Sequence, residues 1–339
     1  MRQTFTVRLL LFLCCCYYLS VNAQFKPAQV LQFQLLDSGK AVSYRGISVV
    51  NEQVFWVSGS KGTVLKSTDG GNTLRQMKVA GYEQRDFRDI HAFDSNTAVI
   101  MAVAEPAVIL RTTDGGNSWQ LVLIDSTKGM FLDAMDFNGS HGIVVGDPIK
   151  HRFYMATTNN GGASWQPLDT LFRPKALPGE ACFASSGTNI VYVNDKRFYL
   201  VTGGGSSRLI TSADYAKPLP LQQGKESTGA NSIAVLKQQM VIVGGDFAAP
   251  KRTDSTHTIA GSWEVGNELP YMSCVQWANE KTLVVCGLNG VFVSGNSGTS
   301  WEQISTIGFH TMAVTSNKKY ATIYLAGGSG KVGKLLLKL

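Results

Sequence analysis

The stretch Thr112-Thr113-Asp114-Gly115-Gly116-Asn117-Ser118-Trp119 decides the fold, because its pattern returns along the chain. Copies occupy residues 67–74, 158–165 and 294–301, and the Asp or Asn position steps by 45, 46 and 136 residues. The last interval equals about three repeats, so two eroded copies should lie within it. Residues 209–212 and 261–263 are the expected remnants. The chain is therefore an array of units of about 45 residues.

Each unit carries four short runs rich in β-forming residues. In the second copy they cover residues 88–93, 98–103, 108–112 and 119–124. Four strands in about 45 residues are typical of a propeller blade. A further copy of the repeated pattern would fall beyond Leu339, so the last blade lacks its fourth strand at the C-terminal end. Residues 30–36 are predicted to form a strand. We expect an all-β, seven-bladed β-propeller of four-stranded antiparallel blades. The N-terminal strand should complete the last blade and close the ring, which removes an open sheet edge.

Residues 1–23 are predicted to be a signal peptide rather than part of the fold. Arg2 and Arg8 flank its start, residues 9–19 are apolar, and cleavage is expected near Ala23. The apolar run is shorter than the roughly 20 residues that a transmembrane helix needs. We expect a secreted or periplasmic protein in which residues 24–339 form one propeller domain. The cysteines at 14–16 leave lipid anchoring open.

Composition limits the functional classes. The chain of 339 residues has 16% charged residues and a formal net charge of +7, without a block of like charges. This balance excludes a disordered chain and gives no sign of nucleic-acid binding. Beyond the leader only Cys182, Cys274 and Cys286 remain, too few for a disulfide framework. Cys274 and Cys286 flank a turn, and the sequence allows either a bridge or two buried thiols. We expect a monomer.

The repeated pattern S/T-x-D-x-G-x-S/T-W is the Asp box, or bacterial neuraminidase repeat, and its role is predicted to be structural. The acid or amide should accept N–H bonds in a tight turn, and the aromatic residue should pack between blades. The residues assigned to these roles are Asp69, Asp114, Asn160, Asn296, Trp119, Trp165 and Trp301. Asn replaces the acid in two copies, so we expect no metal and no cofactor.

Propeller topology places the functional face on the opposite side. The Asp box joins third and fourth strands, so the fourth-to-first and second-to-third connections share the other end of the ring. These connections carry a dense polar set, which we expect to converge on one mouth of the central channel as a ligand- or partner-binding face. The set is Arg45, Arg85, Arg88, Asp89, Glu105, Asp133, Asp147, Glu180 and Asp246.

Several segments resemble the photosystem II stability/assembly factor-like propellers, in particular their relatives in non-photosynthetic bacteria. They are residues 44–50 (YRGISVV), 86–90 (DFRDI), 130–137 (MFLDAMDF), 177–183 (LPGEACF) and 243–247 (VGGDF). The resemblance implies an exported seven-bladed Asp-box propeller. The photosynthetic members are assembly chaperones that bind a membrane-protein subunit through an Arg-containing patch. Arg45, Arg85 and Arg88 are the candidates for an analogous patch.

We therefore expect a binding or assembly scaffold for a protein partner, with envelope and membrane proteins among the candidates. The alternative is a sialidase-like glycoside hydrolase acting on an extracellular saccharide. That chemistry needs three carboxylate-clamping arginines, a Tyr nucleophile and an acidic proton donor. The loose analogues are Arg45, Arg88, Asp89, Glu105, Tyr271 and Asp147, but the Arg-Ile-Pro motif is lacking. Residues 328–334 match a dinucleotide pattern, but the strand-like residues after them provide no helix to hold phosphate.

Overall fold

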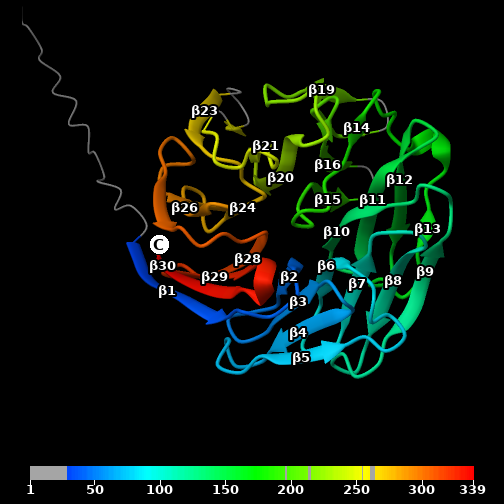
Figure 1. Cartoon of the computed structure of the whole chain (residues 1–339), viewed down its shortest axis with the longest axis horizontal. Helices are drawn as coiled ribbons and strands as arrows, with labels where there is room; N and C mark the ends of the chain where they lie inside the picture. The colour runs from blue at the N-terminus through cyan, green and yellow to red at the C-terminus, as the bar shows by residue number, and fades with distance from the viewer. Residues whose placement is uncertain (1–28, 195–196, 213–214, 254, 260–263) are drawn as a thin grey trace, which may run out of the picture.

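The computed structural model describes residues 29–339 except 195–196, 213–214, 254 and 260–263. Its strands form seven sheets arranged in a ring, and one strand of each sheet lies next to the centre of the ring (Figure 1). We call this innermost strand the first strand of its blade. We number these sheets as blades one to seven in chain order. The prediction of an all-β, seven-bladed propeller is confirmed.

The first three blades follow the predicted pattern of four antiparallel strands. Blade one consists of β2 (Tyr44–Val49), β3 (Phe55–Gly59), β4 (Thr63–Ser67) and β5 (Arg75–Lys78). Blade two consists of β6 (Phe87–Ala92), β7 (Ala98–Ala102), β8 (Ala107–Thr112) and β9 (Gln120–Asp125). Blade three consists of β10 (Leu132–Asn138), β11 (His141–Ile149), β12 (Arg152–Thr158) and β13 (Gln166–Pro167).

Blades four and five contain the eroded repeats. Blade four consists of β15 (Ile190–Asn194), β16 (Arg197–Val201), β18 (Arg208–Ile210) and β19 (Ala216–Pro218). Blade five consists of β20 (Thr228–Leu236), β21 (Gln239–Asp246), β22 (Ser255–Ile259) and β23 (Glu264–Leu269). Two short strands, β14 (Glu180–Ala181) and β17 (Gly203–Gly204), extend the sheet of blade five. The remnant at 209–212 lies at the third strand of blade four, and the remnant at 261–263 lies outside the described residues.

The last two blades complete the ring. Blade six consists of β24 (Cys274–Trp277), β25 (Leu283–Gly287), β26 (Gly290–Ser294) and β27 (Glu302–Ser305). Blade seven consists of β28 (Thr311–Ser316), β29 (Tyr320–Ala326), β30 (Val332–Lys338) and, as its outer strand, β1 (Gln29–Asp37). β1 pairs with β30 from Gln29↔Lys338 to Asp37↔Val332. The N-terminal strand thus closes the ring, as predicted.

The Asp boxes form tight turns between third and fourth strands. In blade one, Asp69 Oδ1 accepts the Thr73 N–H at 2.9 Å, and Asp69 Oδ2 accepts the Thr73 hydroxyl at 2.6 Å. Asp114 makes the same pair of bonds with Ser118. In blade three, Asn160 Oδ1 still accepts the Ser164 N–H at 3.0 Å, while its amide donates to the Ser164 hydroxyl at 2.9 Å. Asn296 does the same with Ser300. An amide therefore replaces the acid without loss of the turn.

A basic residue of one blade binds the Asp box of the next. Lys66 Nζ donates to the Gly115 carbonyl at 3.1 Å, and Arg111 Nε donates to the Gly161 carbonyl at 3.0 Å. Lys334 of blade seven donates in the same way to the Gly70 carbonyl at 2.8 Å. These three bonds, which we call the Asp-box latches, join blades seven, one, two and three in succession. They are charge-assisted, which makes them stronger than neutral hydrogen bonds.

The hydrophobic core lies between the blades. Trp119 meets Trp56 of blade one edge-on with ring centroids 6.4 Å apart. Trp165 meets Phe137 of its own blade edge-on at 5.6 Å, and both pack into the cluster between blades two and three. Trp301 packs against the cluster between blades five and six. Leu74, which replaces the tryptophan in the first copy, packs against the cluster between blades seven and one. Each blade therefore depends on its neighbours for burial.

Cys274 and Cys286 are directly opposed across β24 and β25, and both are free buried thiols, as is Cys182.

Residues 328–330 form a 3₁₀ turn between β29 and β30, so the dinucleotide-like pattern has no following helix. Within the described residues no helix is long and apolar enough to span a bilayer.

Replacing Lys66 by Met tests the latch between blades one and two. Lys66 Nζ also donates to the Ser95 carbonyl at 3.0 Å, and the side chain is buried. Because both carbonyls lose a charged donor, we expect Lys66→Met to lower the free energy of unfolding by about 1–3 kcal/mol. Urea denaturation measures this change, with Lys318→Met, at an exposed turn, as the control. Equal stability of the two variants would contradict a stabilising latch.

Candidate functional site

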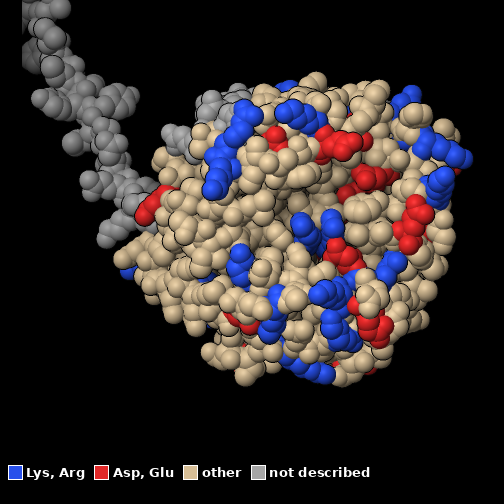
Figure 2. Space-filling model, in the orientation of Figure 1, with Lys and Arg blue, Asp and Glu red and all other residues tan. Residues whose placement is uncertain are grey.

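A cavity of about 440 Å³ opens at the mouth of the ring opposite the Asp boxes. Every blade lines this mouth cavity, through its first strand or the segment that leads into it. The polar contributors on or next to the first strands, from blade one to blade seven, are Arg45, Arg88, Asp133, Ser185, Asn231, Ser273 and His310. The exposed Glu226, just before the first strand of blade five, also lines the cavity. Figure 2 shows basic side chains at the centre of the ring with acidic ones beside them.

Four of these residues lie at the same kind of register shift, a β-bulge, in the first strand of their blade. The pairing of first and second strands shifts between Tyr44 and Gly46, Phe87 and Asp89, Leu132 and Ala134, and Ala230 and Ser232. The residues left out of register are Arg45, Arg88, Asp133 and Asn231. A bulge leaves one residue unpaired and re-aims its side chain. These repeated bulges account for four polar groups that face one cavity.

The two arginines differ in how they are held. Arg88 Nε donates to Asp86 Oδ2 at 2.8 Å, and its guanidinium lies 5.8 Å from the Phe131 ring centre. Arg45 makes no hydrogen bond or ion pair within the described part of the chain. Burial lowers the pKa of Arg45, and the neighbouring charge of Arg88 lowers it further. Arg45 is therefore a partly desolvated cation that an anionic group would stabilise.

Asp133 is the least satisfied group of the cavity. Its side chain is fully buried, and neither carboxylate oxygen has a hydrogen-bond partner among the described residues. Burial raises the pKa of Asp133 well above its ordinary value, and the nearby Asp147 raises it further, against opposing effects of Arg88 and of the nearby Ala184 backbone N–H. Burial also raises the pKa of Asp147 to about 6, while its Oδ1 accepts the Cys182 N–H at 3.1 Å. Burial therefore favours the neutral form of Asp133, which can both donate and accept a hydrogen bond.

Aromatic side chains form the other wall. Phe183 and Phe247 meet edge-on with centroids 5.7 Å apart, and Phe247 meets Tyr271 at 6.3 Å. Phe247 is 42% exposed, and Leu288 beside it is 40% exposed. Of this wall the sequence analysis had singled out only Tyr271. The position of Phe247, directly after Asp246 in a second-to-third connection, was the available signal.

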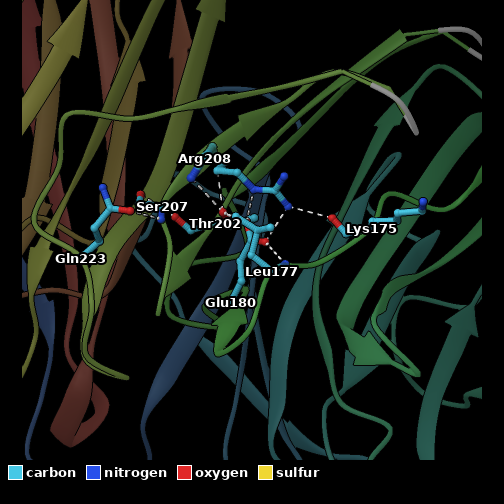
Figure 3. Close-up of polar contacts among 7 residues, drawn as sticks. All are labelled: Lys175, Leu177, Glu180, Thr202, Ser207, Arg208 and Gln223. Atoms are coloured by element: carbon cyan, nitrogen blue, oxygen red, sulfur yellow. Dashed lines mark hydrogen bonds and ion pairs between the residues drawn. The ribbon is translucent and has the colours of Figure 1, made fainter.

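Glu180 lies on this side of the ring but does not line the cavity. Arg208 binds it through two nitrogens, Nε to Oε1 at 2.8 Å and Nη2 to Oε2 at 2.6 Å (Figure 3). The Thr202 hydroxyl donates to Oε1 at 2.6 Å, and the Leu177 N–H donates to Oε2 at 2.7 Å. The side chain is fully buried and fully paired. These bonds join β14 to β18 of blade four and to the segment before β14.

Four other predicted residues also bind the protein's own backbone. Asp89 Oδ2 accepts the Met135 N–H at 2.7 Å, which joins the first strands of blades two and three deeper in the channel. Arg85 Nη2 donates to the Ala104 carbonyl at 2.7 Å and to that of Pro106. Glu105 accepts the Gly129 N–H, and Asp246 accepts the Ala248 N–H at 2.9 Å. The structure thus brings Arg45, Arg88 and Asp133 together in the cavity, with Asp147 nearby.

The histidines provide no metal site in the described part of the chain, where no three His, Cys, Asp or Glu side chains cluster suitably. His91 stacks on Phe137 with centroids 4.5 Å apart, and burial lowers its pKa to about 4. His310 Nδ1 lies 3.0 Å from the Tyr44 carbonyl, and burial lowers its pKa to about 4 as well. Both rings are neutral at physiological pH.

Comparison with known proteins supports the resemblance stated above. Residues 25–131 match the family model described as photosynthesis system II assembly factor YCF48. A curated relative, the photosystem II assembly lipoprotein Ycf48 of Synechococcus sp. (strain CC9902), is 25% identical over 175 residues. That match covers 51% of this chain and about half, 47%, of the relative's length.

Solved structures share the fold over nearly the whole ring. A structure titled "YCF48 bound to D1 peptide" has a TM-score of 0.57 and 14% identity, and covers 91% of this chain and 98% of its own. YCF48 from Cyanidioschyzon merolae has a TM-score of 0.60 and 15% identity, with coverages of 89% and 98%. At these identities the likeness establishes the fold alone.

Replacing Glu180 and Asp133, two buried acids on the same side of the ring, by their amides should affect the stability of the fold differently. Glu180→Gln leaves the buried Arg208 charge without its counter-charge, so we expect a loss of about 3–5 kcal/mol in the free energy of unfolding. Asp133 has no buried counter-charge bound to it and no hydrogen-bond partner for either oxygen among the described residues, so we expect Asp133→Asn to leave the melting temperature unchanged or to raise it. Thermal unfolding at neutral pH measures both. A comparable loss in the two variants would contradict the distinction between a structural and an unsatisfied acid.

Proposed function

We propose that this chain, a propeller of the photosystem II assembly factor-like family, is a scaffold that binds a protein partner at its mouth cavity. The observation that carries the proposal is the group of polar side chains without partners in that cavity: the buried Asp133 carboxyl group and Asn231 carbonyl oxygen, with the partly buried Arg45 beside them. A buried polar group without a partner costs about 1–3 kcal/mol of stability. A bound partner that supplied the missing hydrogen bonds would recover this cost.

The chemistry of the cavity fits a peptide segment. Arg45 and Arg88 offer donors to a carboxylate or carbonyl, and the Asp133 carboxyl group can pair with a backbone amide. Phe183, Phe247 and Tyr271 offer an apolar surface for a side chain. Arginines and exposed aromatic residues are enriched at the energetically important centres of protein interfaces. The similar fold in the D1-peptide complex shows that such a propeller can hold a peptide.

We place this activity outside the cytoplasm. The proposal rests on the leader-like residues 1–23, which lie outside the described residues, and on the name of the curated relative as a lipoprotein. An envelope or membrane protein is the proposed class of partner, and the propeller is proposed to act as a monomer.

Glycoside hydrolysis is the second candidate, favoured by two neighbouring carboxyl groups with raised pKa, Asp133 in the mouth cavity and Asp147 beside it. Such pairs serve as acid and base in glycosidases. The cavity holds two arginines rather than the three of a sialidase, and Arg88 is already paired with Asp86. Turnover of a chromogenic glycoside that is lost in Asp147→Asn would establish this activity.

The binding proposal is tested by affinity capture from the native cell envelope after chemical crosslinking. Arg45→Ala/Arg88→Ala removes both donors from the cavity, and Arg197→Ala changes an exposed arginine at the Asp-box end. All variants are first shown to be folded by their melting temperatures. We expect the wild type and Arg197→Ala to capture the same protein, and the double variant to recover about tenfold less. Equal recovery by all three would place the interface elsewhere, and no recovery by the wild type would contradict a scaffold.

A further inference from the structure

The segment between β13 and β14 presents two large apolar side chains to solvent. Leu171 is 72% exposed and Phe172 is 67% exposed, the highest values among the exposed large hydrophobic side chains described. They are adjacent in the chain and lie on a 3₁₀ turn, Thr170–Phe172. Leu177, farther along the same segment, is 45% exposed. The exposure is therefore a property of the whole connection.

The turn is held in place by its own hydrogen bonds. Asp169 Oδ1 accepts the Leu171 N–H at 2.8 Å, and the Asp169 carbonyl accepts the Phe172 N–H at 3.0 Å. On the other side, Arg173 Nε donates to the Leu168 carbonyl at 2.8 Å, and its guanidinium lies 5.0 Å from the Tyr154 ring centre. Leu171 and Phe172 are thus exposed to solvent on a hydrogen-bonded turn.

A basic edge, which carries the exposed Lys150 and Lys175, adjoins this turn. Arg152 Nη1 donates to the Arg173 carbonyl at 2.6 Å, and the Ala176 N–H donates to the His151 carbonyl at 3.0 Å. These bonds fix residues 173–176 beside the β11–β12 turn, which carries the exposed Lys150, and Lys175 is exposed next to it. Figure 2 shows blue side chains along the outer edge of the ring beside β12. Asp169, the nearest acid in sequence, already accepts the bonds of the turn.

We propose that Leu171, Phe172 and the basic edge dock the propeller onto an anionic membrane surface. Apolar side chains on an exposed turn can enter the interfacial layer of a bilayer, and lysines beside them are attracted to anionic headgroups. Charge complementarity favours anionic lipid over neutral lipid. A protein partner would be expected to meet a pocketed surface, whereas a bilayer needs no matching shape.

The position of the turn determines how a docked propeller is oriented on the membrane. It belongs to the connection from the fourth strand of blade three to the first strand of blade four, which lies at the mouth end of the ring. Docking there would turn the mouth cavity toward the bilayer. The inference itself does not depend on the proposed protein-binding function, because it rests on a separate surface.

Vesicle co-sedimentation of residues 24–339 tests the proposal without any contribution from the leader. All seven sheets lie within residues 29–338, so this chain contains the complete ring, and its folding is checked by thermal unfolding. Vesicles of phosphatidylcholine alone are compared with vesicles that contain about one third phosphatidylglycerol, at low and high salt. We expect binding to the anionic vesicles about tenfold stronger than to the neutral ones, and weakened by salt.

The variants separate the apolar from the electrostatic part. Leu171→Ser/Phe172→Ser should lower binding to anionic vesicles about tenfold. Lys150→Gln/Lys175→Gln should abolish most of the salt dependence. Tyr320→Ser, at an exposed aromatic position on the Asp-box end, is the control and should bind like the wild type. Failure of the wild type to prefer anionic vesicles, or undiminished binding by Leu171→Ser/Phe172→Ser, would overturn the proposal.

Discussion

The pairing of β1 with β30 is the interaction on which the rest of the structure depends. It joins the N-terminal strand to the last blade, and Lys334 of the same blade then latches onto the Asp box of blade one. A ring closed in this way fixes the distance of every first strand from a common axis. Seven strand ends therefore meet at one mouth, and small changes at equivalent positions of the repeat produce one cavity.

The two ends of the ring have different physical roles. At the Asp-box end, the acid or amide of each box is hydrogen-bonded within its turn, and three of the boxes are joined to the preceding blade by a latch. At the mouth end, Asp133 and Arg45 are withdrawn from water without partners, and Phe247 is partly exposed beside them. Unsatisfied buried groups are costly, and their concentration at one cavity is a mark of a functional site. The exposed Leu171–Phe172 turn adds a second surface at the same end.

The repeat was enough to predict the blade number, the strand order and the closure of the ring, because each follows from spacing and chain length. It also predicted which end of each strand the polar residues occupy. It could not predict where their side chains point. Asp133 and Glu180 look alike in sequence, yet a bulge aims one into the cavity and Arg208 pairs the other. Phe183 and Phe247 of the aromatic wall were not predicted as site residues, because they lie in irregular connections that no repeat constrains.

The most direct test of the central claim is photo-crosslinking from the mouth itself. A photoreactive phenylalanine analogue placed at Phe247 stands at the edge of the cavity, and the same analogue at Tyr320 stands on the Asp-box end. In the native envelope the account predicts a discrete protein adduct from position 247 that disappears when Arg45 and Arg88 are replaced by alanine. An adduct of the same protein from position 320, with none from position 247, would contradict it.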